Sequence, residues 1–474
     1  ALLSLKTNEL GSFVTVEPSF VRVYPMKDLC AHYLGYIAAP TEKEESDLGL
    51  RRHLYMKIGR GGVERVFEKE LHGKEGSDLL ELDAHRRVVR SDRILPSVSG
   101  KDVYLSLDAR LQKFCAELVK NYASASIVVL DANTGEVLAF VSHPSFDPHI
   151  FCKKIPQPLW KSLVDNPYKP LLNKPIQGLY APGSTIKSCL VLEGLEQGDI
   201  NFSSKTECAG LMTVGRHPFH CWMHRWGGHG SVGADEAVMT SCDVFMYHLG
   251  KRLGAERMEK VLSMFGVGKT ELPGFPESRR GILPTPTWKK TAGKGLWGPG
   301  DTVQMSIGQG FMLSTPLQLA VMMARIASGK KVFPQILRSR REKAEKFQKL
   351  PFSDKNLDFT RKSLFNVVNN RRGTAFRWRI TEPGMEMAGK TGTSQVCRIS
   401  LSERHAGVRS NSQRSWETRD HALFVGYAPF FPPKPKSGKK QFSVSVTVDH
   451  GGGGGSVAAP LANKILSYAQ KLDS

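Results

Sequence analysis

A serine and a lysine three residues apart open an apolar run near the middle of the chain. Ser184 and Lys187 follow Pro182 and Gly183 in the stretch APGSTIKSCLVLEGLEQG. The pattern predicts a helix that begins near Ser184, and residues three apart on a helix share a face. A serine hydroxyl is a poor nucleophile until a base takes its proton, and a lysine amine is a base only when uncharged. Ser184 is therefore a candidate nucleophile and Lys187 its candidate base.

The S-x-x-K spacing is too common to identify a site by itself. It recurs at Ser328–Lys331 and Ser437–Lys440, both in lysine-rich sequence that indicates a solvated surface. Two further motifs follow Ser184 in order: S-C-D at 241–243, and K-T-G-T at 390–393, which contains the only K-T-G of the chain. S-x-x-K with S-D-N and K-T-G is the signature of β-lactamases and penicillin-binding proteins, and here S-C-D stands in the place of the second motif.

The third motif supplies charge and hydrogen-bond donors. We expect Lys390 to place a fixed positive charge near the site, which helps to keep the lysine base uncharged and attracts a substrate carboxylate. Thr391 and Thr393 offer hydroxyl groups to that carboxylate, and Gly392 leaves room for a substrate that lies along the strand. Backbone N–H groups of Thr393 and of the nucleophile are expected to form the oxyanion hole.

The second motif has two interpretations. In the catalytic interpretation, Ser241 relays a proton to the leaving amine, and Asp243 hydrogen-bonds Lys187 or the substrate amide. In the structural interpretation, both residues cap a helix, because Ser and Asp are favoured at helix N-termini.

Around the motifs, the sequence predicts an α+β fold. Two apolar β runs flank residues 131–135, whose Asn and Gly suit a tight hairpin turn. Further strands are predicted at 421–429 and 442–450, the latter with one buried face because apolar and hydroxyl side chains alternate. Helices are predicted at 108–122 and after the glycine run 451–455, which is either a flexible linker or a tight turn. Strands at both ends and a helical middle predict an antiparallel sheet covered by helices.

Composition narrows the class of partner. Lys and Arg number 66 against 45 Asp and Glu, which gives a net charge of +21 and favours anionic partners. Nucleic acid is not expected, because no basic helix or basic patch with interleaved aromatic residues occurs. The chain also has no apolar run long enough to span a bilayer.

Sequence blocks across nearly the whole chain resemble class B penicillin-binding proteins, the peptidoglycan D,D-transpeptidases, and in particular their elongation-specific subgroup. Besides the three motifs, they include GRGGVERVFEKELHGKEG, VVLDANTGEVLAFVSHPSFDPHIF, HALFVGYAPF and GGSVAAP. The resemblance implies a partial, β-rich pedestal of the dimerisation type over residues 1–104. It also implies a penicillin-recognising transpeptidase domain over residues 105–474, with a five-stranded-type antiparallel sheet against a helical cluster. S-C-D replaces S-x-N in the second motif, and elongation-type members often have this Asp.

The resemblance also implies a reaction. Ser184 would attack the D-Ala-D-Ala bond of a stem peptide, release D-Ala and pass the acyl group to an amine of a neighbouring stem. β-Lactams would acylate the same serine, and no cofactor is expected for catalysis. Implied partners are the lipid-linked peptidoglycan precursor and a membrane-embedded SEDS-type glycosyltransferase. The implied location is the periplasmic face of the bacterial inner membrane, with a single N-terminal anchor that this chain lacks.

Two other classes of function remain open. One is a hydrolase of the same superfamily, a serine D,D-carboxypeptidase or a β-lactamase, whose acyl-enzyme must meet an activated water. The other is a catalytically idle β-lactam sensor. A stand-alone β-lactamase needs neither a domain like residues 1–104 nor a chain of this length, which favours the transpeptidase.

Four potential metal ligands lie close together in the sequence: Cys208, Cys221, His229 and Cys242. Their spacing is not that of a common zinc module. However, Cys242 lies between two residues that should face the active site, so its thiol should point away from that site, into a second layer. Elongation-type relatives also look to hold a zinc beneath this motif through a His, the motif Cys and carboxylates. We therefore expect a structural Zn²⁺ bound by three Cys and one His. The alternatives are a Cys208–Cys221 disulfide, unliganded buried thiols, or His220 or His224 as a ligand.

Overall fold

The computed structural model describes residues 21–42, 44, 57–74, 76–85, 88–338, 347–397, 403, 409–434 and 438–473. These residues form two compact units, one of residues 21–103 with 146–160, and one of residues 104–145 with 161–473. Of the pedestal expected over residues 1–104, residues 1–20, 43, 45–56, 75, 86 and 87 lie outside the described part.

The first unit is built from short elements. They are η3 (Lys27–Cys30), α1 (Ala31–Leu34), β1 (Ile37–Ala38), β2 (Ile58–Gly59), α3 (Gly62–Val66), α4 (Glu68–Leu71), β3 (Ser77–Leu82), β4 (Val88–Leu95) and η4 (Pro148–Cys152). The segment 146–160, expected in the second domain, packs here instead. The backbone N–H of Tyr24 donates to His149 Nε2 at 3.0 Å, and the ring of Tyr36 stacks on Phe151 at 4.0 Å.

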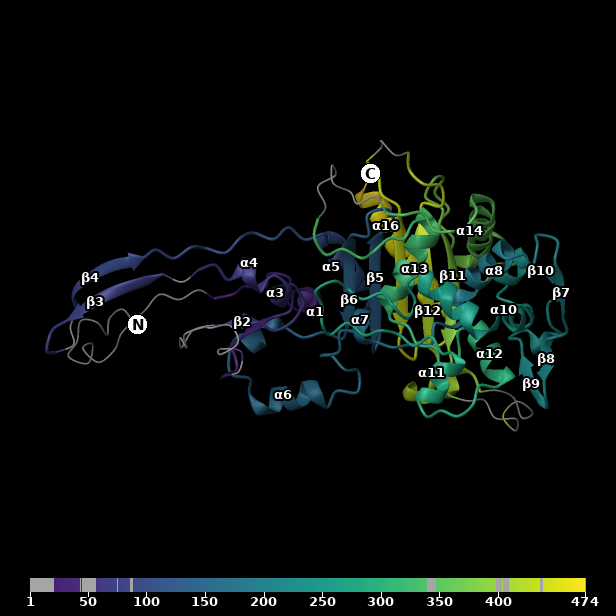
Figure 1. Ribbon diagram of the computed structural model, residues 1–474, viewed down its shortest axis with the longest axis horizontal. Helices are drawn as coiled ribbons and strands as arrows, with labels where there is room; N and C mark the ends of the chain where they lie inside the picture. Colours follow the sequence, from purple (N-terminus) through teal and green to yellow (C-terminus); the bar gives the residue numbers. More distant parts are fainter. Residues whose placement is uncertain are drawn as a thin grey trace. The chain divides into compact units, whose positions relative to one another are not determined.

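The second unit is organised around a five-stranded antiparallel sheet (Figure 1). Its strands are β5 (Ala125–Asp131), β6 (Val137–His143), β11 (Ala388–Ser394), β12 (His421–Ala428) and β13 (Phe442–Val448), in the order β11-β12-β13-β5-β6. The predicted hairpin is present between β5 and β6, where Asp131 accepts a hydrogen bond from the Asn133 N–H at 2.8 Å. The predicted fold class is confirmed, and the K-T-G motif lies on the edge strand β11.

Both faces of the central strands are buried, which differs from the expected single buried face at 442–450. Successive side chains of a strand point to opposite faces. Every residue of β13 is nevertheless buried, including Ser443, Ser445 and Thr447, and both α13 (Pro316–Ser328) and α16 (Ala459–Leu472) pack against this strand. The alternating sequence pattern therefore identified the strand, but it did not predict that helices pack on both of its faces.

The remaining helices belong to the second unit, except one that begins in the first unit at Gln157 and ends in the second at Val164. They are α5 (Ala109–Val119), α6 (Gln157–Val164), α7 (Lys174–Gln177), α8 (Lys187–Glu196), α9 (Ala234–Met239), α10 (Asp243–Met264), α11 (Pro286–Thr291), α12 (Pro299–Ser306) and α14 (Asp354–Asn369). α8 packs against α10 and α14, and α14 packs against β11. This packing places the three motifs on neighbouring elements. Among the described residues, no helix is long and apolar enough to cross a membrane.

The glycine run 451–455 forms a close turn between β13 and α16. A Cβ at Gly454 would overlap the carbonyl oxygens of Gly392 and Leu423, so only a glycine permits this approach to the edge strand. The turn continues into η11 (Gly454–Ala458) and then into α16, which tolerates Pro460 because a proline in the first turn removes no helical hydrogen bond. Of the two interpretations of the run, the tight turn is the one present.

Candidate active site

The candidate nucleophile lies in a turn that is fixed from two sides. Ser184 belongs to the 3-10 turn η5 (Gly183–Ile186), which runs directly into α8. Gly183 has a φ of +55°, and a Cβ there would lie 2.7 Å from the carbonyl oxygen of Thr393. On the other side, the Gly183 N–H donates to the Gly308 carbonyl at 2.9 Å. The turn is therefore held between β11 and the segment after α12.

Lys187 connects the first motif to the second. Its side chain is fully buried, and its amine donates to the Ser241 carbonyl at 3.0 Å, to Ser241 Oγ at 3.2 Å and to Asp243 Oδ1 at 2.6 Å. Lys187 follows Ser184 in the sequence by one helical turn. The structure thus brings the predicted base, the proton relay and the carboxylate to one point.

The capping interpretation of the second motif does not describe its geometry. Ser241 precedes the N-cap residue of α10, which is Cys242, and Ser241 has a left-handed φ of +60° that is rare outside glycine. Asp243 accepts from Lys187 and from the backbone N–H of Trp222, at 3.1 Å, on another segment. Both side chains are directed to the site and not to their own helix.

The two lysines of the site have different surroundings. Lys390 is fully buried in β11, and burial, followed by the nearby charge of Lys187, lowers the pKa of Lys390 well below its usual value. Lys187 is the lysine that has a carboxylate partner. Burial raises the pKa of Asp243, although the Lys187 charge opposes that shift. The carboxylate of Asp243, at 2.6 Å, is therefore paired with Lys187.

The other residues of the third motif are held by different contacts. The Thr393 carbonyl accepts from Gln309 Nε2 at 2.9 Å, so this residue directs its backbone away from β12. The N–H and C=O of one strand residue point to the same edge, so the Thr393 N–H is directed to the open edge beside Ser184, as an oxyanion hole requires. Thr391 is held differently, because its hydroxyl lies 2.8 Å from the hydroxyl of Thr374.

Gly392 serves a purpose other than the one expected. A Cβ there would lie 2.7 Å from Thr185 Cγ2 and 3.1 Å from the Pro182 carbonyl oxygen. The space beside Gly392 is thus filled by the turn that carries the nucleophile and is not reserved for substrate. Because Gly392 has no side chain, that turn can pack on β11.

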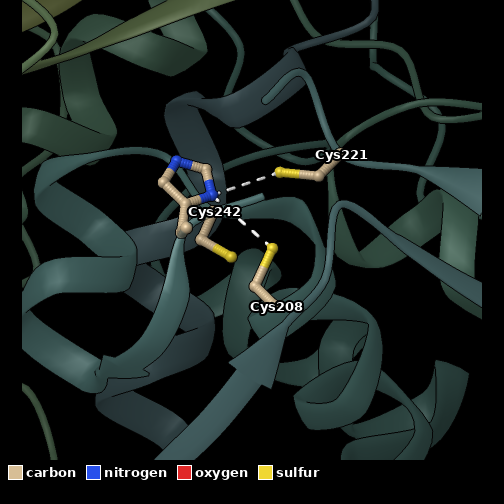
Figure 2. A group of neighbouring side chains, drawn as sticks. Cys208, Cys221 and Cys242 are labelled. Atoms are coloured by element: carbon tan, nitrogen blue, oxygen red, sulfur yellow. Dashed lines mark hydrogen bonds between the residues drawn. The ribbon is translucent and has the colours of Figure 1, made fainter. Parts of the chain in front are cut away.

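The predicted metal ligands form a compact cluster beneath the second motif. The ligand atoms of Cys208, Cys221, His229 and Cys242 lie within 4.8 Å of one another, and Figure 2 shows the three thiols directed to one point. Cys208 ends β7 (Lys205–Cys208), which pairs with β10 (Gly230–Gly233). His229 Nδ1 lies 3.6 Å from Cys208 Sγ and 3.4 Å from Cys221 Sγ. Neither His220 nor His224 belongs to the cluster.

This geometry fits tetrahedral zinc. Zn–S and Zn–N bonds of about 2.3 and 2.1 Å place sulfur and nitrogen ligands about 3.6 Å apart. All eight cysteines are free thiols, so the alternative Cys208–Cys221 disulfide is not formed. The hydrogen bond between the Cys242 and Cys221 thiols lowers the pKa of Cys221 and raises the pKa of Cys242, so this contact favours the thiolate at Cys221.

Comparison with known families decides the class of protein. Residues 125–467 match the penicillin-binding protein transpeptidase domain, and residues 3–105 match the penicillin-binding protein dimerisation domain. The chain belongs to the penicillin-binding proteins. The family predicted from the motifs is confirmed, and so is the fold that this resemblance implied.

The sequences and structures of individual relatives align with this penicillin-binding protein over most of its length. The peptidoglycan D,D-transpeptidase MrdA of Acinetobacter baumannii is 35% identical over 471 residues, 96% of this chain and 67% of the relative. A complex between PBP2 and MreC of Helicobacter pylori has a TM-score of 0.80 at 28% identity, covering 95% of this chain and 79% of that chain. A peptidoglycan synthase complex that coordinates polymerization and crosslinking has a TM-score of 0.78 at 27% identity, covering 95% and 76%.

Sequence reasoning missed three residues of this penicillin-binding protein that hold its motifs in place. Gln309 supports Thr393, Trp222 supports Asp243, and Thr374 contacts Thr391. Two had a usable signal, since Gln309 stands between glycines at 308 and 310 and Trp222 follows a predicted metal ligand. Thr374 had none.

Proposed function

We propose that this chain is the peptidoglycan D,D-transpeptidase of cell-wall elongation, acting through an acyl-enzyme on Ser184. One observation carries the proposal: the buried amine of Lys187, one turn after Ser184, contacts both Ser241 and Asp243. The relatives named as D,D-transpeptidases support the same reaction.

The base must first become uncharged. The nearest acceptor for a proton of Lys187 is Asp243, at 2.6 Å, and burial raises the pKa of this carboxyl group. Transfer of one proton within the pair yields a neutral amine without moving net charge into the site. This route adds a proton acceptor to the expected help from the charge of Lys390.

Acylation then follows from the geometry. Ser184 Oγ attacks the carbonyl carbon of the penultimate D-Ala while its proton passes to Lys187. The Lys187 amine passes a proton to Ser241, which delivers its own to the leaving nitrogen as the C–N bond to the terminal D-Ala breaks. The N–H groups of Ser184 and Thr393 stabilise the oxyanion, a contribution of about 10²–10³ in rate for one donor. An amine of a second stem then attacks the ester, and Ser184 regains its proton.

The proposal is tested with a pentapeptide donor and an amine acceptor. The wild-type chain should release D-Ala and form the cross-linked peptide, and the Ser184→Ala variant should do neither. Release of D-Ala with hydrolysed donor alone would instead indicate a carboxypeptidase, and no release would indicate an idle sensor.

We propose as partners the lipid-linked precursor and a membrane-embedded SEDS-type glycosyltransferase, at the periplasmic face of the inner membrane, with β-lactams as inhibitors. Support comes from the relatives, since one solved structure holds MreC and another is a synthase complex that couples polymerization to crosslinking. Site-directed crosslinking from the first unit in membranes tests the partnership, and recovery of no membrane glycosyltransferase would contradict it.

We further propose that Cys208, Cys221, His229 and Cys242 hold a structural Zn²⁺. Three thiolates and one imidazole form a closed set without a water position, which is typical of structural rather than catalytic zinc. Bound there, the metal would tie the loop that carries Cys221 to the start of α10, where the Asp243 N–H already donates to Cys221 Sγ at 3.4 Å. Metal analysis of the purified chain should find one zinc per molecule.

A further inference from the structure

A threonine outside the three motifs touches the K-T-G strand. Thr374 follows α14, and its hydroxyl lies 2.8 Å from that of Thr391, which is 9% exposed. The two residues come from different segments, so this contact exists only because the loop after α14 returns to the edge strand.

Three neighbouring segments fix the position of Thr374. The Ala375 N–H donates to the Val367 carbonyl at 3.0 Å, which folds the loop back onto α14. The Thr374 N–H points to the carbonyl of Met239, the last residue of α9, at 3.4 Å. A Cβ at Gly455 would lie 2.9 Å from the Thr374 carbonyl oxygen, so the glycine turn also leaves room for this loop.

The chemistry of the pair gives the two hydroxyls unequal roles. A hydroxyl carries one proton and can accept further hydrogen bonds, whereas a carboxylate only accepts. When Thr391 donates its proton to a substrate carboxylate, Thr374 must be the donor within the pair. Hydrogen bonds in such a chain polarise one another, so the Thr374 proton strengthens the bond from Thr391 to the anion.

We propose that Thr374 is a positioning residue that orients the Thr391 hydroxyl toward the C-terminal carboxylate of the substrate. The proposal rests on the transpeptidase function proposed above. It assigns to Thr374 a part in carboxylate recognition and none in the transfer of the acyl group.

The test compares Thr374→Val, Thr374→Ser and wild type in acylation by a fluorescent penicillin and by its methyl ester, which lacks the carboxylate. Thr374→Val keeps the shape but removes the donor. It should lower the second-order acylation constant for the free acid about tenfold, near the upper end of what one lost hydrogen bond between neutral groups contributes. The loss should lie in binding rather than in the first-order acylation rate, Thr374→Ser should restore it, and the methyl ester should react equally with all three proteins.

Thr360→Val is the matched control, because Thr360 is a buried threonine of α14 whose hydroxyl donates only to the Asn356 carbonyl, at 2.9 Å. It should leave both reactions unchanged. An unchanged constant for Thr374→Val, an equal loss with the methyl ester, or failure of Thr374→Ser to rescue would overturn the proposal for Thr374 alone. Absence of acylation in the wild type would overturn the transpeptidase function together with it.

Discussion

The amine of Lys187 and the carboxylate of Asp243 form an ion pair at 2.6 Å, with the lysine side chain fully buried and the aspartate side chain 13% exposed. The pair joins the first turn of α8 to the first turn of α10. Lys390, buried in the adjacent strand, instead donates to the Thr391 carbonyl at 3.4 Å.

Replacing Asp243 by Asn should destabilise the fold and slow acylation. The substitution leaves a buried ammonium without its anion, which costs about 3–5 kcal/mol of unfolding free energy. It also removes the proton acceptor of Lys187, so acylation should fall by about 10²-fold. Urea unfolding and stopped-flow acylation measure the two effects. Glu271→Gln is the control, since its ion pair with Arg280 is exposed and should contribute less than about 1 kcal/mol.

Replacing Lys390 by Met should stabilise the protein while it abolishes acylation. Burial lowers the pKa of Lys390, so the folded state binds fewer protons here than the unfolded state, and wild-type stability should rise with pH toward the lysine value of 10.5. The Met variant lacks this dependence. Its advantage in urea unfolding should therefore be large near pH 7 and shrink at higher pH. An advantage that grows with pH would contradict a lowered pKa at Lys390.

Gly392→Ala should impair the site through packing. The new Cβ would lie 2.7 Å from Thr185 Cγ2, so the turn that carries Ser184 must move away from β11. A misplacement near 1 Å costs about 10²-fold in rate, which acylation kinetics would detect. Gly61→Ala is the control, because nothing lies within 4 Å of a Cβ at Gly61. Full activity of Gly392→Ala would show that the turn does not depend on this contact.

The motifs could be found from the sequence because each is a local pattern. Ser184, Lys187 and the K-T-G residues stand at fixed spacings, and their order in the chain was sufficient to predict a common site. The role of Gly392 was not predictable, because it depends on which segment packs against β11. The same holds for Thr374, which lies 17 residues from its partner with no pattern to connect them.

The charges of the site were harder to predict than its residues. Whether Lys187 or Lys390 is neutral depends on burial and on the distance to Asp243, and neither quantity is encoded in a motif. The burial of Ser443 and Ser445 was missed for a related reason. An alternating strand has the same sequence pattern whether its polar face meets water or a closely packed helix.

Cys221→Ser should release the metal if zinc occupies the cysteine cluster. Zinc content should fall from one per chain toward zero, and the unfolding temperature should drop, because binding of a metal to the folded state stabilises it. Cys115→Ser is the matched control, since Cys115 is fully buried in α5 and lies outside the cluster. Equal zinc in wild type and Cys221→Ser would remove Cys221 from the ligand set.

Intact-mass spectrometry with a penicillin tests the central claim most directly, that Lys187 activates Ser184. The wild-type chain should gain the mass of one penicillin, and the peptide that carries the adduct should contain Ser184. Lys187→Met should gain none over the same interval and retain its fold. An adduct on another residue, or equal acylation of the lysine variant, would contradict the account.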